Sequence, residues 1–149
     1  MKFQEIAHYY LGCKVVLRNG EYTLNPQLLV PIKDGNLECK PILRKLSDIT
    51  IEEAAKVMQM VFHPNVEYPL KDYKLTINDA GNARITMGND WYEVNLTFGN
   101  QTGSIWACDT RSENVKIRFD VYHYLLSRHF DLFNLIENEE AIWLNDILN

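Results

Sequence analysis

Hydrophobic and polar residues alternate along the middle of the chain, from Tyr73 to Asp109. Successive side chains of a β-strand point to opposite faces, so a period of two predicts strands with one buried and one solvated face. Short turns rich in Gly and Asn separate the alternating segments, which favours antiparallel neighbours. The pattern predicts an antiparallel meander of about four strands, within residues 73–78, 83–87, 91–98 and 104–109.

A helical period precedes this region. Thr50 and Glu53 fit a capping box, in which each side chain accepts a hydrogen bond from the other residue's backbone N–H. Apolar residues then recur every three or four positions, and Pro64 follows the last of them. We expect a helix that begins after Thr50, ends before Pro64 and packs its apolar stripe against the core.

The N-terminal third carries shorter signals. Apolar spacing over residues 3–10 indicates a short helix ended by Gly12, and Asn19-Gly20 is typical of the tight turn of a hairpin. The segment 26–36 contains two prolines and an Asp-Gly pair, so it is expected to be a loop.

The last thirty or so residues are the most densely apolar part of the chain. A closing helix capped near Ser112 and continuing towards Phe130 would have two adjacent apolar stripes, which indicates burial on more than one side. We expect this segment to cover the buried face of the meander. Residues 139–148, "EEAIWLNDIL", are compatible with either an edge strand or a short helix.

These elements predict a single α+β domain over residues 1–149. Its antiparallel meander is covered on one face by helices, and the N-terminal hairpin extends or flanks the sheet. A chain of 149 residues with 46% hydrophobic residues has enough apolar surface for one core.

Charge and cysteine content exclude several classes of protein. The net charge is −5 and the basic residues of segment 33–45 are interspersed with acidic ones, so nucleic-acid binding is not expected. The three cysteines are widely spaced and indicate free thiols instead of a disulfide framework. The sequence shows neither a signal peptide nor a membrane-spanning run, so a cytoplasmic location is expected.

No catalytic, cofactor-binding or metal-binding residue is predicted. His123 and His129 lie about 240° apart around a helix, which prevents them from holding one metal ion from one face. Cys108 with His123 is the strongest pair for an enzyme, but no nucleophile motif surrounds it. The sequence therefore favours a protein that is not an enzyme.

The polar face of the meander is the candidate interaction surface. Its predicted residues are Arg84, Trp91, Glu93, Asn95 and Thr97. An exposed tryptophan among polar side chains suits protein recognition, because amphipathic aromatic residues anchor interfaces. The alternative is a tryptophan packed under a loop at the end of a strand.

Three segments carry a family resemblance: "HYYLGCKVVLRNG", "KPILRKLSDIT" and "HYLLSRHFDLFNLIENEEAI". They resemble small uncharacterised phage and prophage proteins of Bacteroides-type gut bacteria, in which segments like "YLPYGLKV", "ILRPLSDL" and "HFDLFGLIEKGLAI" recur. The meander lies outside the resemblance. This chain has Lys45 where the pattern has Pro, Asn134 where it has Gly, and Asn138-Glu139 where it has Lys-Gly.

The resemblance implies a setting, the cytoplasm of a phage-carrying bacterium, and no activity. We expect an accessory protein that is a non-enzymatic protein-interaction or regulatory module with a host or phage protein as its partner. The alternatives are an enzyme or enzyme subunit in phage nucleic-acid metabolism and a virion assembly protein. Homodimerisation is compatible with each.

Overall fold

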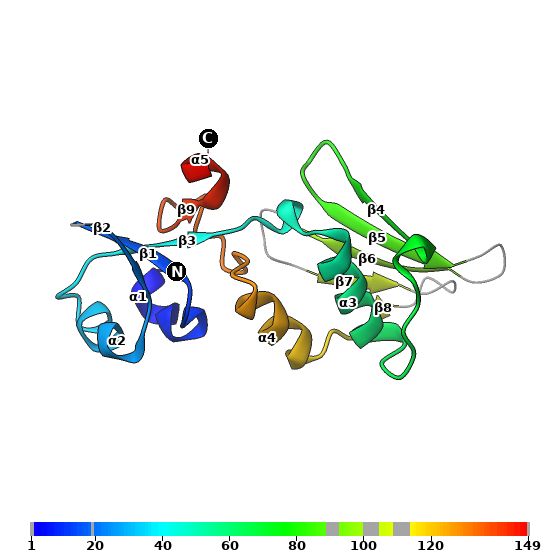
Figure 1. Ribbon diagram of the computed structural model, residues 1–149, viewed down its shortest axis with the longest axis horizontal. Coiled ribbons are helices and arrows are strands. Elements are labelled where there is room, and N and C mark those ends of the chain that lie inside the picture. The colour runs from blue at the N-terminus through cyan, green and yellow to red at the C-terminus, as the bar shows by residue number, and fades with distance from the viewer. Residues whose placement is uncertain (1, 19, 89–92, 100–104, 109–113, 149) are drawn as a thin grey trace. The chain divides into compact units, whose positions relative to one another are not determined.

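The computed structural model describes residues 2–18, 20–88, 93–99, 105–108 and 114–148 (Figure 1). The chain forms two compact units. Unit 1 comprises Met1–Lys45 and Leu125–Asn149, and unit 2 comprises Leu46–Tyr124. Helices and strands occur together with antiparallel sheets, so the predicted α+β class is confirmed. The single domain over residues 1–149 stays a prediction, and each unit is described by itself.

Unit 1 contains a four-stranded sheet in the order β2-β1-β3-β9. Its strands are β1 (Lys14–Leu17), β2 (Gly20–Thr23), β3 (Lys40–Leu43) and β9 (Ile142–Trp143). The predicted hairpin is present as β1 and β2, but it belongs to this sheet and does not extend the meander. Strand β9 pairs in parallel with β3. Both alternatives for residues 139–148 occur, because helix α5 (Leu144–Leu148) follows β9 directly.

Three short helical segments complete the N-terminal part of unit 1: α1 (Phe3–Ile6), the 3-10 turn η1 (Ala7–Tyr10) and α2 (Pro26–Lys33). Helix α2 corrects the loop expected there. Asn25 caps it by accepting a hydrogen bond from the Leu28 N–H, and Pro26 stands in the first turn, where no intrahelical N–H bond is lost. Pro31 is tolerated inside the helix.

The C-terminal segment completes the core of unit 1. Phe130 and Leu135 are fully buried, and Leu135 packs in one cluster with Phe3, Tyr10 and other N-terminal residues. The Tyr10 hydroxyl donates to the Phe130 carbonyl at 2.8 Å and accepts from the Leu132 N–H at 3.2 Å. The segment is therefore a core element, as expected, but of unit 1.

One buried carboxylate organises the turn after Phe130. Asp131 accepts hydrogen bonds from the backbone N–H groups of Phe133, Leu135 and Ile136. Its own N–H donates to the Arg44 carbonyl, and Arg44 in turn donates to the His129 carbonyl. These bonds fasten residues 129–136 to the end of β3.

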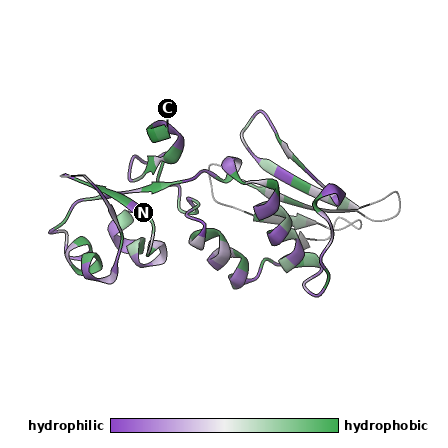
Figure 2. Ribbon diagram, in the orientation of Figure 1, coloured by the Kyte–Doolittle hydropathy of each residue, from purple (hydrophilic) through white to green (hydrophobic). Residues whose placement is uncertain are grey.

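Unit 2 contains the predicted meander, in the order β4-β5-β6-β7-β8 and antiparallel throughout (Figure 1). Its strands are β4 (Tyr73–Ile77), β5 (Ala83–Gly88), β6 (Glu93–Phe98), β7 (Ile105–Cys108) and β8 (Asn114–Val115). The register brings Ile85 opposite Leu96, both fully buried, and Arg84 opposite Thr97 on the other face. The alternation of hydropathy that predicted these strands is visible along β5 in Figure 2.

Helix α3 (Ile51–Phe62) covers the apolar face of the meander. It contacts β4, β5 and β6, and its buried residues include Val57 and Met58. The predicted capping box is confirmed, because the Glu53 N–H donates to the Thr50 hydroxyl and the Thr50 N–H donates to the Glu53 carboxylate. The 3-10 turns η2 (Leu46–Asp48) and η3 (Leu70–Asp72) flank this helix.

The closing helix is shorter than predicted. Helix α4 spans Phe119–Ser127 and crosses from unit 2 into unit 1 at Leu125. The predicted cap, Ser112, lies outside the described residues. Residues 114–115 form β8, which pairs with β7 and has a strand conformation in place of the expected helix. Hence the predicted cover of the meander by the closing segment is wrong: α3 provides the cover.

Candidate functional site

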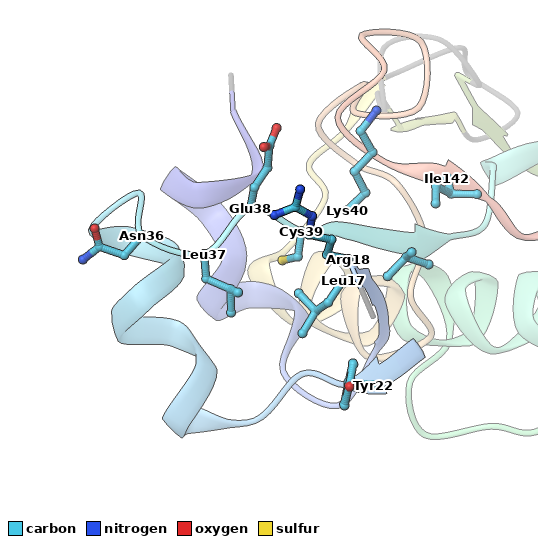
Figure 3. Close-up of a pocket in the computed structure, with 10 residues that line it drawn as sticks. Leu17, Arg18, Tyr22, Asn36, Leu37, Glu38, Cys39, Lys40 and Ile142 are labelled. Atoms are coloured by element: carbon cyan, nitrogen blue, oxygen red, sulfur yellow. The ribbon is translucent and has the colours of Figure 1, made fainter. Parts of the chain in front are cut away.

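A groove of about 810 Å³ opens in unit 1 where β1 and β3 stop pairing (Figure 3). The two strands pair at Val15–Pro41 and Val16–Lys40. The same register, continued, would bring Leu17 opposite Cys39 and Arg18 opposite Glu38, but these pairs do not form. The groove lies between the end of the hairpin, at Leu17 and Arg18, and the segment before β3, at Glu38 and Cys39.

The groove has two chemically different sides. Leu17 lies on the same face of the hairpin as Tyr22, and Arg18 follows Leu17 in the turn of the hairpin. Figure 3 shows the charged ends of Arg18, Glu38 and Lys40 on one side and Leu17, Leu37 and Tyr22 on the other. The site can therefore contact apolar and charged groups of one ligand at the same time.

Two cations of the groove have no counter-ion in the part of the chain that the structure describes. Arg18 and Lys40 are exposed, and neither forms an ion pair there. Glu38 is the one carboxylate among the described lining residues, so the lining carries a formal charge of +1 (two cations minus one anion). The groove is thus locally positive in a chain whose net charge is −5.

The backbone at the mouth of the groove also lacks a partner within the described residues. Within the described residues, neither Arg18 nor Glu38 takes part in a hydrogen bond between backbone groups. The last pair of the ladder is formed by Val16, two positions before Arg18, and Lys40, two positions after Glu38. Because polar backbone groups bind strongly to any partner that excludes water, Arg18 and Glu38 offer donors and acceptors to an extended ligand.

The cysteines of unit 1 are poor nucleophiles at neutral pH. Burial raises the pKa of Cys39, which lines the groove, to about 11, and burial together with the nearby Cys39 raises the pKa of Cys13 to about 12. Both thiols therefore stay protonated, and a thiolate is the form that attacks substrates or binds metal ions. Among the residues open to description, no group of three His, Cys, Asp or Glu side chains is arranged to hold a metal ion.

The predicted interaction surface is described only in part. Arg84 is exposed and stands opposite the half-buried Thr97 on the polar face of the meander. Glu93 and Asn95 belong to β6, but their side chains lie outside the described set, as does the whole of Trp91. This surface stays a prediction.

The pair proposed for an enzyme is likewise untested. The structure describes the backbone of Cys108 in β7 and not its side chain, so its distance from His123 is outside the description. His123 is exposed on α4, where its ring stacks on that of Phe119 at 6.3 Å. His129 is half-buried, and burial and then the charges of Arg128 and Arg44 lower its pKa.

A second hollow lies in unit 2, between α3 and the segment 67–70, with a volume of about 510 Å³. Tyr68 and the buried Tyr73 line it, and the Tyr73 hydroxyl and the His63 Nε2 are 2.7 Å apart. Burial lowers the pKa of His63, so the ring is neutral at physiological pH. Its charged lining residues are Glu52, Lys56 and Glu67.

Sequence reasoning did not find the groove of unit 1. The basic residues of segment 33–45 suggested a solvated surface, and Lys40 is indeed exposed. What makes it part of a site is the neighbouring hairpin residue Arg18, more than twenty positions earlier, and no local pattern reports that neighbour. The predicted hairpin was an available signal, since the register of β1 and β2 places Arg18 directly after β1.

Comparisons with protein-family models, with curated proteins and with solved structures found no match to this chain. Among the described helices, none combines the length and apolar character that crossing a bilayer requires.

Proposed function

We propose that the chain is a non-enzymatic protein-interaction or regulatory module that binds a segment of a partner protein in the groove of unit 1. The observation that carries the proposal is the unfinished ladder between β1 and β3, where Arg18 and Glu38 have no backbone partner among the described residues. Backbone groups that a ladder leaves open can pair with an extended segment of another chain. The open shape of the groove suits a chain segment better than a small enclosed ligand.

The chemistry of the lining favours binding over catalysis. The Cys39 thiol is protonated at neutral pH, because burial raises its pKa to about 11. Glu38 is exposed, without the burial that usually prepares a carboxylate for proton transfer. Affinity for a protein segment needs none of these groups to change its protonation state.

The proposed setting is a phage or prophage protein acting in a bacterial cytoplasm, with a host or phage protein as its partner. It depends on the resemblance of the three segments. One structural observation supports that resemblance: Asn134 and Glu139 have φ of 60° and 61°, the left-handed region that favours glycine. At both positions the closing segment of the resembling pattern has glycine.

Affinity capture from lysate of a host that carries the active phage, after nuclease treatment, tests the proposal. Three tagged forms are compared: the wild type, the groove variant Arg18→Gln/Lys40→Gln, and the meander variant Arg84→Gln. We expect a stoichiometric partner with the wild type and with Arg84→Gln, and its loss with the groove variant. All three forms should have the same melting temperature, since the substituted residues are exposed.

Other outcomes point elsewhere. Loss of the partner from Arg84→Gln alone would move the interaction to the polar face of the meander and overturn the role of the groove. No partner with any form, together with a thermal shift by a nucleotide that Cys108→Ala or His123→Ala abolishes, would replace the proposal with the enzyme alternative.

A further inference from the structure

Resting on the proposed function, we infer the chemistry of the partner: an extended peptide segment in which acidic and apolar residues alternate. The groove of unit 1 offers charged groups on one side and apolar groups on the other. A ligand in a strand conformation presents its side chains to opposite sides at successive positions. Such a segment can place its acidic residues towards Arg18 and Lys40 and its apolar residues towards Leu17, Leu37 and Tyr22.

The placement of the two cations fits this pattern. Lys40 stands directly opposite Val16, and Arg18 follows β1 in the turn of the hairpin. Figure 3 shows the charged ends of both residues on the same side of the groove. In an extended peptide, side chains two residues apart point the same way and are about 7 Å apart. Two acidic residues separated by one apolar residue can therefore reach Arg18 and Lys40 together.

Backbone pairing supplies the second part of the recognition. The ladder between β1 and β3 ends at Val16 and Lys40, and the residues two positions further along each segment, Arg18 and Glu38, have no backbone partner within the described residues. A segment lying along either margin satisfies these groups through its own N–H and C=O groups. The contact is independent of side-chain identity, so the charges and apolar groups determine specificity.

Charge complementarity selects an acidic peptide over nucleic acid. A polyanion would gain from Arg18 and Lys40 but would meet the repulsion of Glu38 nearby and of a chain with a net charge of −5. An acidic peptide has few charges, and its apolar side chains bury the Leu17 and Leu37 surface.

Titration of the full-length protein with a short capped peptide of alternating Glu and Val tests the inference. We expect saturable binding that weakens as salt rises, and no binding of the matched peptide of alternating Lys and Val. Arg18→Gln and Lys40→Gln should each weaken binding roughly two- to fivefold, the range expected for exposed charge pairs. Glu38→Gln should strengthen it, because a repulsive carboxylate is removed.

Two controls separate groove binding from a general charge effect. Lys74→Gln removes an exposed lysine of β4 in unit 2 and should leave the affinity unchanged. Amide hydrogen exchange should slow at Arg18 or Glu38 when the Glu-Val peptide binds, as backbone pairing requires.

The inference is overturned by equal affinity of the two peptides, by an affinity insensitive to Arg18→Gln and Lys40→Gln, or by a single-stranded oligothymidylate that binds and displaces the Glu-Val peptide. Absence of any peptide binding also overturns it. The proposed function has a separate readout: a captured partner that is lost with Arg18→Gln/Lys40→Gln keeps the interaction role even when the Glu-Val peptide fails.

Discussion

Two residues in the turns after Phe130 adopt a backbone conformation that most side chains disfavour. Asn134 and Glu139 have φ of 60° and 61°, and both lie beside the backbone bonds that close the turns to Leu135 and Ile136. A side chain other than Gly, Asn or Asp costs about 1–2 kcal/mol in the left-handed region. Asn is tolerated there, because its short amide bonds locally, whereas Glu is not.

We expect Glu139→Gly to raise the free energy of unfolding by about 0.5–1 kcal/mol, because the relief of the left-handed glutamate exceeds the entropic cost of glycine. Asn134→Gly is the matched control and should change stability by less than about 0.5 kcal/mol. Urea denaturation measures both. A Glu139→Gly protein less stable than the wild type would show that the left-handed geometry is not a source of strain.

The raised pKa values of the two thiols of unit 1 predict that the free energy of unfolding falls at alkaline pH. Burial raises the pKa of Cys13 from 9.0 to about 12 and that of Cys39 from 9.0 to about 11. From about pH 9 up to these raised pKa values, the folded chain keeps thiol protons that the unfolded chain releases. The free energy of unfolding therefore falls as pH rises above about 9. The stabilising effect of the neutral thiols is fully present below that pH.

Measurement is cleanest with Cys108→Ala as the background, so that its thiol does not contribute. Iodoacetamide should label native Cys13 and Cys39 slowly at neutral pH, and the free energy of unfolding should decline from about pH 9 to about pH 12. Replacing Cys39 by Ala should remove part of the decline. Fast labelling of the folded protein at neutral pH would contradict the burial of these thiols.

At the scale of elements, α3 combines a capped N-terminus with an apolar side that packs on the meander of unit 2. Its N-terminus is closed by the reciprocal bonds of Thr50 and Glu53, and its apolar side covers β4, β5 and β6. Thr50→Ala should lower the free energy of unfolding by about 1 kcal/mol, the usual cost of losing a helix cap. Thr50→Ser keeps the hydroxyl and should be close to neutral. Equal losses for both variants in thermal or urea denaturation would rule out the cap as the cause.

Elements whose information is local were predictable from the sequence. The cap and the stop of α3 lie within a few residues of the helix, and each meander strand pairs with its neighbour along the chain, so alternation and short turns were sufficient. Helix α2 was missed because Pro26 and Pro31 suggest a break. Pro26 instead occupies the first turn, and the Asn25 cap compensates for a weak helical sequence.

Contacts between distant segments were not predictable. Strand β9 pairs with β3 across about a hundred residues, in parallel, and the two strand segments are too short to specify a partner by pattern. The division into two units and the groove of unit 1 both follow from such contacts. Hence the polar face of the meander, which a period of two reveals, was predicted as a surface, and the groove was not.

At the scale of the whole molecule, the C-terminal segment contributes essential core residues to unit 1. Ending the chain after Ser127 removes Phe130 and Leu135, both fully buried, and leaves Tyr10 without its hydrogen-bond partners at Phe130 and Leu132. Losing even one large core side chain typically costs about 2–5 kcal/mol, and several such losses exceed the stability of a small domain. We expect amides of β1 and β3 to lose their protection against hydrogen exchange in the shortened protein.

Ending the chain after Leu144 is the matched control, because it removes a helix whose described residues include no buried side chain. That protein should keep the protection of β1 and β3. If β1 and β3 instead stayed protected without residues 128–149, the core of unit 1 would not require its C-terminal segment, and the groove beside it would be formed by the N-terminal hairpin alone.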